Sequence, residues 1–286
     1  MGIKLGTPKP QGGGFVGILD VSQQATTPKG VDFNGDGTKM FLLGQNKTGP
    51  FQFDDLVFQY DLSTAFDVTT ASYNNIFKDV SEASAGFQTE FFSPQAIHIP
   101  QPGDKLHFAG NSNNVIQWVL STPFDITTAT WDNVDEDIGD VSEIESLTTN
   151  PTGTKLFGTD ISPPRVIEFT FFGDPFDAGS LGGSTNSVET FSVDPEMQVP
   201  VGIAFNTTGT RMFVLDTTPP KVFQYNLGTG FDVLTASFSG KTFDLSGTAF
   251  EPRDVKINNA DTRIFVTDFQ QENVLQYDLP AAGELQ

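Results

Sequence analysis

Alternation of apolar and polar residues recurs in five copies along this chain. Each copy carries a short strand-like run, a tight polar turn and a second strand-like run. The five segments are Phe33–Phe41, Ile99–His107, Thr149–Phe157, Phe205–Phe213 and Ile257–Phe265. A period of two residues predicts β-strands. A unit that repeats in this way must stack on its copies to bury its apolar face, so we expect an all-β repeat protein.

A third strand in each copy has the most regular pattern. In every copy an amide or carboxylate side chain is followed by an aromatic residue. The polar members are Gln59, Gln117, Glu168, Gln224 and Gln276. So uniform a register indicates one shared packing role and not five binding sites.

The turn between the first two strands has its own signature. Four copies place glycine there, at Gly37, Gly103, Gly153 and Gly209. Glycine supplies the positive φ that such a turn requires. The fifth copy has Asp261, a residue that tolerates the left-handed region better than most. A connector with Phe-Asp at its centre follows the third strand, as in Leu62–Tyr73, and predicts an aromatic plug beside an Asx-type turn.

The two ends of the chain complete each other. The fifth copy stops at Leu279, after its third strand, whereas Gly17–Ser22 reads as a fourth strand with no first three before it. Pairing these segments closes a ring and leaves no open sheet edge. We predict one five-bladed β-propeller of four-stranded antiparallel blades over residues 15–280. Residues 1–14 form an N-terminal extension and residues 281–286 form a tail.

Charge excludes some partners. The chain has 15 Lys and Arg against 36 Asp and Glu, a net charge of -21. Nucleic-acid binding needs a basic surface, so we expect no nucleic-acid partner. No stretch approaches the length that spans a bilayer, and we expect no membrane insertion. The N-terminus has no apolar core of a secretory signal. There is no cysteine, so the fold needs no disulfide.

The strand–turn–strand segments resemble the repeats of surface-layer and TolB-type propellers. Together with the connector Leu62–Tyr73, they resemble more specifically the repeats of tail-fibre and structural proteins of marine bacteriophages. The resemblance covers residues 15–280. It implies a β-propeller on a virion or cell surface, and it carries over no catalytic residues.

Two long insertions break the repeat and are the predicted ligand site. They are Gly44–Asp55 and Glu82–Ser93, which should be neighbours on one face of the ring. Aromatic rings beside amides suit sugar recognition, because a ring offers a flat apolar platform and an amide offers fixed hydrogen bonds. The candidate residues are Phe51, Gln52, Phe53, Phe87, Gln88, Glu90, Phe91 and Phe92. The alternative is that the phenylalanines cover the core or contact a partner subunit.

Other chemistry is less well supported by the sequence. Asp32–Gly37 matches the start of a calcium loop, but the twelfth position is Leu43 instead of glutamate, and the segment is also the turn of a blade. His98 and His107 lie on adjacent strands, and we interpret them as core or solvated residues instead of a metal pair. We expect no catalytic residues, no metal and no cofactor.

A glycoside hydrolase would need two carboxylates around the central funnel. The five equivalent first-strand positions are Asp32, His98, Thr148, Ala204 and Lys256, with one carboxylate among them. Glu145, Glu251 and Asp254 lie at strand entries and could face the mouth of the funnel.

The sequence thus favours a non-enzymatic structural or adhesion protein of a phage virion. It would serve as a capsid or tail decoration or as a fibre module, at the virion surface. Its partners would be host-surface glycan or another virion protein. A cellular lectin-like or scaffold propeller, at the cell surface or in the cytoplasm, is the first alternative, and a glycoside hydrolase using Glu145, Glu251 or Asp254 is the second.

Overall fold

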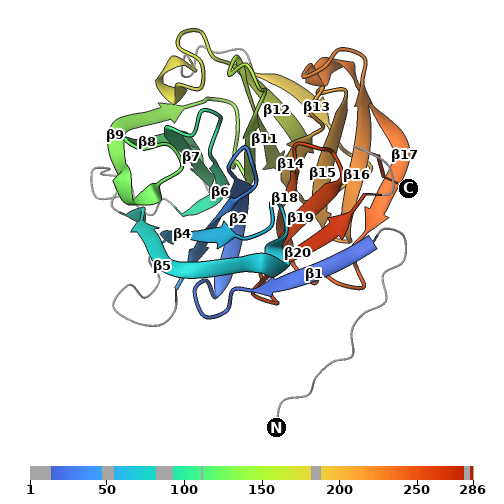
Figure 1. Cartoon of the computed structure of the whole chain (residues 1–286). Helices are drawn as coiled ribbons and strands as arrows, with labels where there is room; N and C mark the ends of the chain where they lie inside the picture. The colour runs from blue at the N-terminus through green and yellow to red at the C-terminus, as the bar shows by residue number, and fades with distance from the viewer. Residues whose placement is uncertain are drawn as a thin grey trace.

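Five four-stranded antiparallel sheets form a ring in the computed structural model (Figure 1). The structure describes residues 14–46, 55–81, 93–110, 112–181, 188–279 and 284–285. The sheets are the blades of a five-bladed β-propeller, as the repeats predict. In each blade the first strand lies innermost and the fourth lies outermost.

The strands follow the repeat in chain order. Blade 1 consists of β2 (Thr27–Phe33), β3 (Lys39–Gln45), β4 (Asp55–Leu62) and β5 (Ala71–Asp79). Blade 2 consists of β6 (Pro94–His98), β7 (Lys105–Gly110), β8 (Ser112–Leu120) and β9 (Ala129–Asp137). Blade 3 consists of β10 (Ser146–Thr149), β11 (Lys155–Ile161), β12 (Pro164–Thr170) and β13 (Glu189–Ser192). Blade 4 consists of β14 (Pro200–Phe205), β15 (Arg211–Thr217), β16 (Pro220–Leu227) and β17 (Ala236–Asp244).

The N-terminal strand closes the ring, which confirms the predicted strand exchange. Blade 5 consists of β18 (Pro252–Ile257), β19 (Arg263–Asp268) and β20 (Asn273–Asp278) from the C-terminal end, with β1 (Gly14–Asp20) as its outer strand. Strand β1 pairs antiparallel with β20, from Gly14 opposite Asp278 to Asp20 opposite Asn273. Figure 1 shows these two segments side by side, although they come from opposite ends of the sequence.

The hydrophobic core lies between the blades. Each of five apolar clusters takes residues from two neighbouring blades, as Phe41 of blade 1 and Trp118 of blade 2 do in one cluster. Both of these side chains are fully or almost fully buried. Because each blade supplies one wall of two clusters, no blade can bury its apolar faces without its neighbours.

Connector phenylalanines explain the turn glycines. The rings of Phe66, Phe124, Phe176 and Phe231 lie directly on the four turn glycines of their own blades. A Cβ added at Gly209 would lie 2.2 Å from Phe231 Cδ2. In blade 5, Asp261 occupies the same turn position at φ 54°. The predicted aromatic plug and Asx-type turn are both confirmed, since Asp232 accepts a hydrogen bond from the Leu234 amide.

The repeated amide of the third strand holds neighbouring blades together. Gln276 of blade 5 accepts a hydrogen bond from the Val68 amide in the connector of blade 1, at 2.8 Å. Four further contacts of this kind are Gln59 with Ile126, Gln117 with Ala178, Glu168 with Val233, and Gln224 with Leu285. The predicted shared packing role is therefore confirmed. In the last contact Leu285 holds the position that a connector residue holds in the other four.

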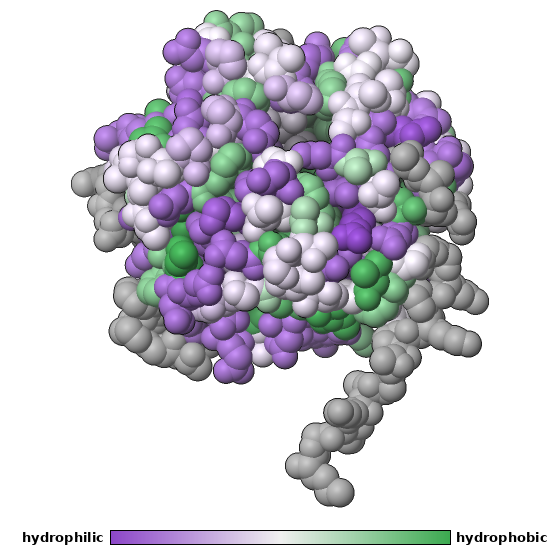
Figure 2. Space-filling view, viewed as in Figure 1, coloured by the Kyte–Doolittle hydropathy of each residue, from purple (hydrophilic) through white to green (hydrophobic). Residues whose placement is uncertain are grey.

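Polar side chains cover much of the face seen in Figure 2, with apolar residues in small groups among them. This agrees with a net charge of -21. Among the residues that the structure describes, no helix has the length and apolar character needed to cross a bilayer.

Candidate functional site

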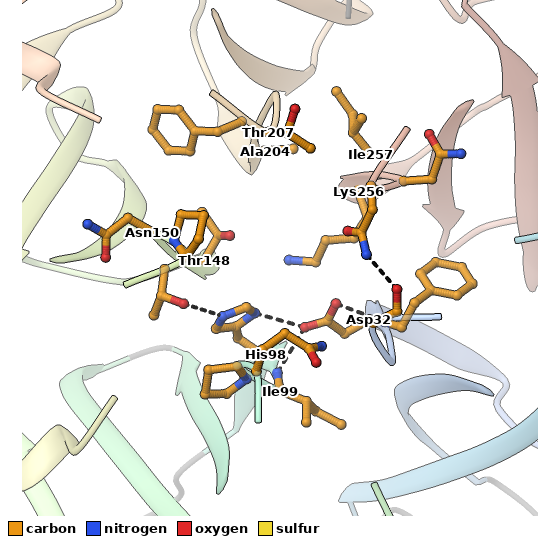
Figure 3. Close-up of a pocket in the computed structure, with 18 of the residues that line it drawn as sticks. Asp32, His98, Ile99, Thr148, Asn150, Ala204, Thr207, Lys256 and Ile257 are labelled. Carbon is orange, nitrogen blue, oxygen red and sulfur yellow. Dashed lines mark hydrogen bonds and ion pairs between the residues drawn. The ribbon is translucent and has the colours of Figure 1, made fainter. Parts of the chain in front are cut away.

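A funnel at the centre of the ring is the site with the most concentrated chemistry. It encloses a cavity of about 390 Å³ on the face that carries the turns between the first and second strands. One ring of its lining comes from equivalent positions on the five innermost strands, Asp32, His98, Thr148, Ala204 and Lys256. These are the positions at which alignment of the five repeats predicts funnel residues. Figure 3 shows their side chains around one space.

Three adjacent blades supply a chain of hydrogen bonds in this cavity. His98 Nδ1 lies 2.8 Å from Asp32 Oδ2, and His98 Nε2 lies 2.9 Å from Thr149 Oγ1. Asp32 lies near the end of β2, His98 is the last residue of β6, and Thr149 is the last residue of β10. The imidazole therefore bridges a carboxylate on one side and a hydroxyl on the other.

The environment of Asp32 keeps its carboxylate ionised. Burial alone would raise its pKa, but the charges of His98 and Lys256 and hydrogen bonds from His98 and the Ile99 amide outweigh this effect, so the pKa of Asp32 lies below its usual value. The Phe33 amide also donates to Oδ1 at 2.8 Å. An ionised carboxylate can only accept hydrogen bonds. Hence the Nδ1 atom of His98 carries a proton, and in the neutral ring Nε2 is left to accept.

Lys256 places a positive charge in the same funnel. Its side chain is 8% exposed, and Nζ donates to the Leu147 carbonyl oxygen at 2.9 Å. Nζ also lies 3.6 Å from Asp254 Oδ2. An ammonium group has three donors. The funnel thus combines one ionised carboxylate, one imidazole and one ammonium in a chain whose overall charge is strongly negative.

Buried polar contacts across the axis form the floor of the funnel. Asp254 accepts hydrogen bonds from the Val31 amide at 3.1 Å and from Ser146 Oγ at 3.0 Å, and Ser146 Oγ accepts from the Ile203 amide at 3.1 Å. Burial raises the pKa of Asp254 to about 6. These contacts join blades 1, 3, 4 and 5. A Cβ at Gly202 would lie 2.8 Å from the Val255 amide nitrogen, so the blades approach closely at this level.

The rim of the funnel is polar and also joins neighbouring blades. Thr207 donates to the Asp261 carboxylate from its amide at 3.0 Å and from its hydroxyl at 2.8 Å. Asn259 Nδ2 donates to the Gly35 carbonyl oxygen. Gln101 lies on the same rim. A ligand that enters the funnel therefore passes amide, hydroxyl and carboxylate groups before it reaches His98.

The residues predicted from the sequence for ligand binding or catalysis have different outcomes. The candidate glycan residues Phe51, Gln52, Phe53, Phe87, Gln88, Glu90, Phe91 and Phe92 all lie outside the described residues. Of the residues proposed for glycoside hydrolysis, Asp254 lies in the floor, and Glu145 and Glu251 do not line the funnel cavity. The Asp32–Gly37 segment comprises the end of β2 and the turn that follows it, where Asp36 accepts hydrogen bonds from Thr38.

The two histidines have different roles. His107 is fully buried, as predicted for a core residue, and burial lowers its pKa to about 3. Its Nε2 faces two carbonyl-type acceptors, Gln117 Oε1 at 3.2 Å and the Phe176 carbonyl oxygen at 3.0 Å, so Nε2 carries the proton. His98, interpreted from the sequence as a core or solvated residue, instead lies in the funnel wall and is held by a carboxylate. The carboxylate that holds it comes from the neighbouring blade, 66 residues away in the sequence.

One group of carboxylates in the described part of the chain lies close enough to hold a cation. It consists of Glu168, Glu189 and Asp232. However, Lys155 Nζ forms an ion pair with Glu168, and the Val233 amide donates to the same carboxylate at 2.9 Å. These contacts give Glu168 a structural role, because they link blade 3 to the connector of blade 4.

The comparisons with known proteins show which solved structures share the fold. The sequence matches no family model and no curated protein. Among solved structures, a periplasmic gluconolactonase of Pseudomonas aeruginosa has a TM-score of 0.51 at 14% identity, over 91% of this chain and 70% of that one. A provisionally assigned 6-phosphogluconolactonase of Bacteroides uniformis has a TM-score of 0.53 at 13% identity, over 90% of this chain and 69% of that one. A chain of a nidogen/laminin complex has a TM-score of 0.50 at 12% identity, over 88% of this chain and 75% of that one.

These comparisons bear on two predictions. At such identities the likeness establishes the shared fold, and it lends no support to the resemblance to surface-layer or phage proteins. The prediction that the chain is not an enzyme is contradicted, because two of the neighbours with this fold are lactonases by description. From the sequence, the funnel was judged a poor catalytic site because only one of its five ring positions is a carboxylate. That judgement did not consider acid–base chemistry by a carboxylate and an imidazole from adjacent blades.

Proposed function

We propose that the chain is a hydrolase that opens a small polyhydroxylated lactone or ester in the central funnel. The observation that carries the proposal is the Asp32–His98–Thr149 hydrogen-bond chain inside a cavity of about 390 Å³. A cavity of this size fits a small molecule. A carboxylate, an imidazole and a hydroxyl in this order are the groups that acyl transfer requires.

The proposed reaction needs one base that becomes an acid. His98 Nε2 takes a proton from the attacking oxygen as that oxygen bonds to the carbonyl carbon. The ring C–O bond then breaks, and His98 returns the proton to the departing alkoxide. The Asp32 carboxylate orients the imidazole and stabilises its protonated form. Lys256 contributes positive charge to the cavity, where negative charge develops on the carbonyl oxygen.

The chemistry of the lining supports the choice of substrate. Amide, hydroxyl and backbone groups of the rim can hydrogen-bond several hydroxyls of a sugar acid. The apolar contribution comes from Phe33, Phe66, Phe176, Phe205 and Phe231, which line the wall of the cavity. The lactonase descriptions of two structural neighbours show that propellers of similar shape include enzymes for this substrate class.

Acid release from a panel of sugar lactones and simple esters tests the proposal. A pH-stat follows the wild type and His98→Gln in parallel, because general acid–base catalysis contributes about 10²–10⁴-fold to the rate. We expect His98→Gln to lose that factor. The matched control is His107→Phe, which replaces the chain's second histidine with the residue that the four other blades have at this position. Equal rates for wild type and His98→Gln would reject the proposal.

Binding to host-surface glycan or to another virion protein through residues 51–53 and 87–92 stays a prediction. A glycan array with purified protein tests it, with Phe91→Ala and Phe92→Ala as variants. Saturable binding that both substitutions weaken would support the predicted site.

A further inference from the structure

The hydroxyl at the end of the hydrogen-bond chain has no counterpart in the other blades. Thr149 follows the funnel ring by one position, and the equivalent residues are Phe33, Ile99, Phe205 and Ile257. Phe33 and Phe205 pack against the connector rings of their own blades, with centroid distances of 5.7 and 5.3 Å to Phe66 and Phe231. Blade 3 gives up this aromatic contact and places a hydroxyl at the same position.

The hydrogen-bond chain joins residues of three adjacent blades, Asp32 of blade 1, His98 of blade 2 and Thr149 of blade 3. The five members of the funnel ring all differ in type, whereas the position of Thr149 is apolar in the other four blades. A packing role at that position would be served by an apolar residue. Because the hydroxyl that replaces it contacts His98, a chemical role explains this departure better than packing does.

We propose that Thr149 Oγ1 is the nucleophile of the hydrolase and forms a covalent acyl intermediate. This step rests on the proposed function. In the neutral form of the His98 ring, the ionised Asp32 fixes the proton on Nδ1, so Nε2 accepts the hydrogen bond from the Thr149 hydroxyl. This is the arrangement in which an imidazole activates a hydroxyl nucleophile. Thr149 also lines the cavity, so its oxygen can reach a bound carbonyl carbon.

The steps balance without a further reagent. Thr149 Oγ1 bonds to the carbonyl carbon of the lactone as its proton moves to His98 Nε2. The ring C–O bond breaks, and the alkoxide takes that proton. Water then attacks the threonyl ester and gives a proton to His98, the bond to Thr149 Oγ1 breaks, and Thr149 regains its proton. For a lactone the alkoxide stays attached, so the intermediate has the mass of the protein plus the whole lactone.

A substrate-independent probe separates this inference from the proposed function. Diisopropyl fluorophosphate modifies activated hydroxyls: the P–F bond breaks, a P–O bond forms, and fluoride leaves with the proton that His98 removes. We expect one adduct by intact mass in the wild type and in Thr149→Ser, mapped by peptide sequencing to position 149 in both. Thr149→Val, which keeps the shape without the hydroxyl, and His98→Gln should give none. An unmodified Thr149 in the wild type would overturn the inference.

Lactone hydrolysis by the same variants completes the test. If Thr149 is the nucleophile, Thr149→Val loses about 10²-fold or more, as does His98→Gln, and Thr149→Ser retains activity. If Thr149→Val remains as active as the wild type while His98→Gln is inactive, the inference is wrong and the proposed function stands with water as the attacking group. If the wild type hydrolyses nothing in the panel, the proposed function fails, and labelling at Thr149 alone decides whether the hydroxyl is activated.

Discussion

Replacing Gly209 with alanine should destabilise the protein in two separable ways. Gly209 has a φ of 69°, a region that costs an L-residue roughly 1–2 kcal/mol. In addition, the new Cβ would lie 2.2, 2.4 and 2.5 Å from three atoms of the Phe231 ring. Inserting a methyl group into a packed site costs about 1–3 kcal/mol when neighbours must move. The sum is about 2–5 kcal/mol of unfolding free energy.

Gly240 offers a matched control in the same blade. Its φ is 78°, and no atom lies within 4 Å of a Cβ placed there. Gly240→Ala should therefore show the backbone cost of roughly 1–2 kcal/mol alone. Urea denaturation followed by tryptophan fluorescence measures both variants. The double variant Gly209→Ala/Phe231→Ala should lose less stability than the sum of its single substitutions, because the overlap is gone. Equal destabilisation by Gly209→Ala and Gly240→Ala would refute the reasoning.

Two further predictions concern the contacts between strands and blades. Burial lowers the pKa of His107 from the reference value of 6.5 to about 3 in the folded protein. The unfolded chain therefore takes up a proton at His107 more readily, and the protein loses stability as the pH falls from 6.5 toward 3. The free energy of unfolding of His107→Phe should therefore differ less between pH 7 and pH 4 than that of the wild type, by about 3 kcal/mol. Denaturation of both proteins at pH 7 and pH 4 measures this, and an equal difference in the two proteins would contradict the prediction. Gln276→Leu leaves the buried Val68 amide without its acceptor and should lower the free energy of unfolding by about 1–3 kcal/mol. Wild-type stability of this variant would show that the hydrogen bond between the two blades is dispensable.

Most of the fold could be predicted because the same local features recur in each repeat. Each tight turn, each third strand and each Phe-Asp connector appears several times, so an error in one copy is corrected by the others. The partner of Gln276 could not be predicted, because Val68 belongs to a neighbouring blade 208 residues away. The partner of Gln224 was also missed, since Leu285 and its neighbours share none of the connector's sequence.

The site was harder to predict than the fold. Aligning the repeats did identify Asp32 and His98 as equivalent funnel positions on adjacent blades. What the alignment could not supply was the distance between them, and without it one carboxylate in five positions looked like a poor catalytic set. Thr149 was missed for another reason. Strict alternation assigns it to the face opposite Thr148, but β10 ends at Thr149, and both residues line the cavity.

The most direct test of the account is the rate of lactone hydrolysis by Asp32→Asn beside the wild type. An asparagine cannot hold the charge that fixes the His98 tautomer, so kcat/KM should fall by about 10²–10⁴-fold while circular dichroism shows a folded propeller. Asp36→Asn, an exposed change in the turn that follows β2, should hydrolyse lactones at the wild-type rate. A folded Asp32→Asn protein with wild-type kcat/KM, or a wild type with no hydrolytic activity, would contradict the claim that the Asp32–His98 pair is the acid–base centre of this propeller.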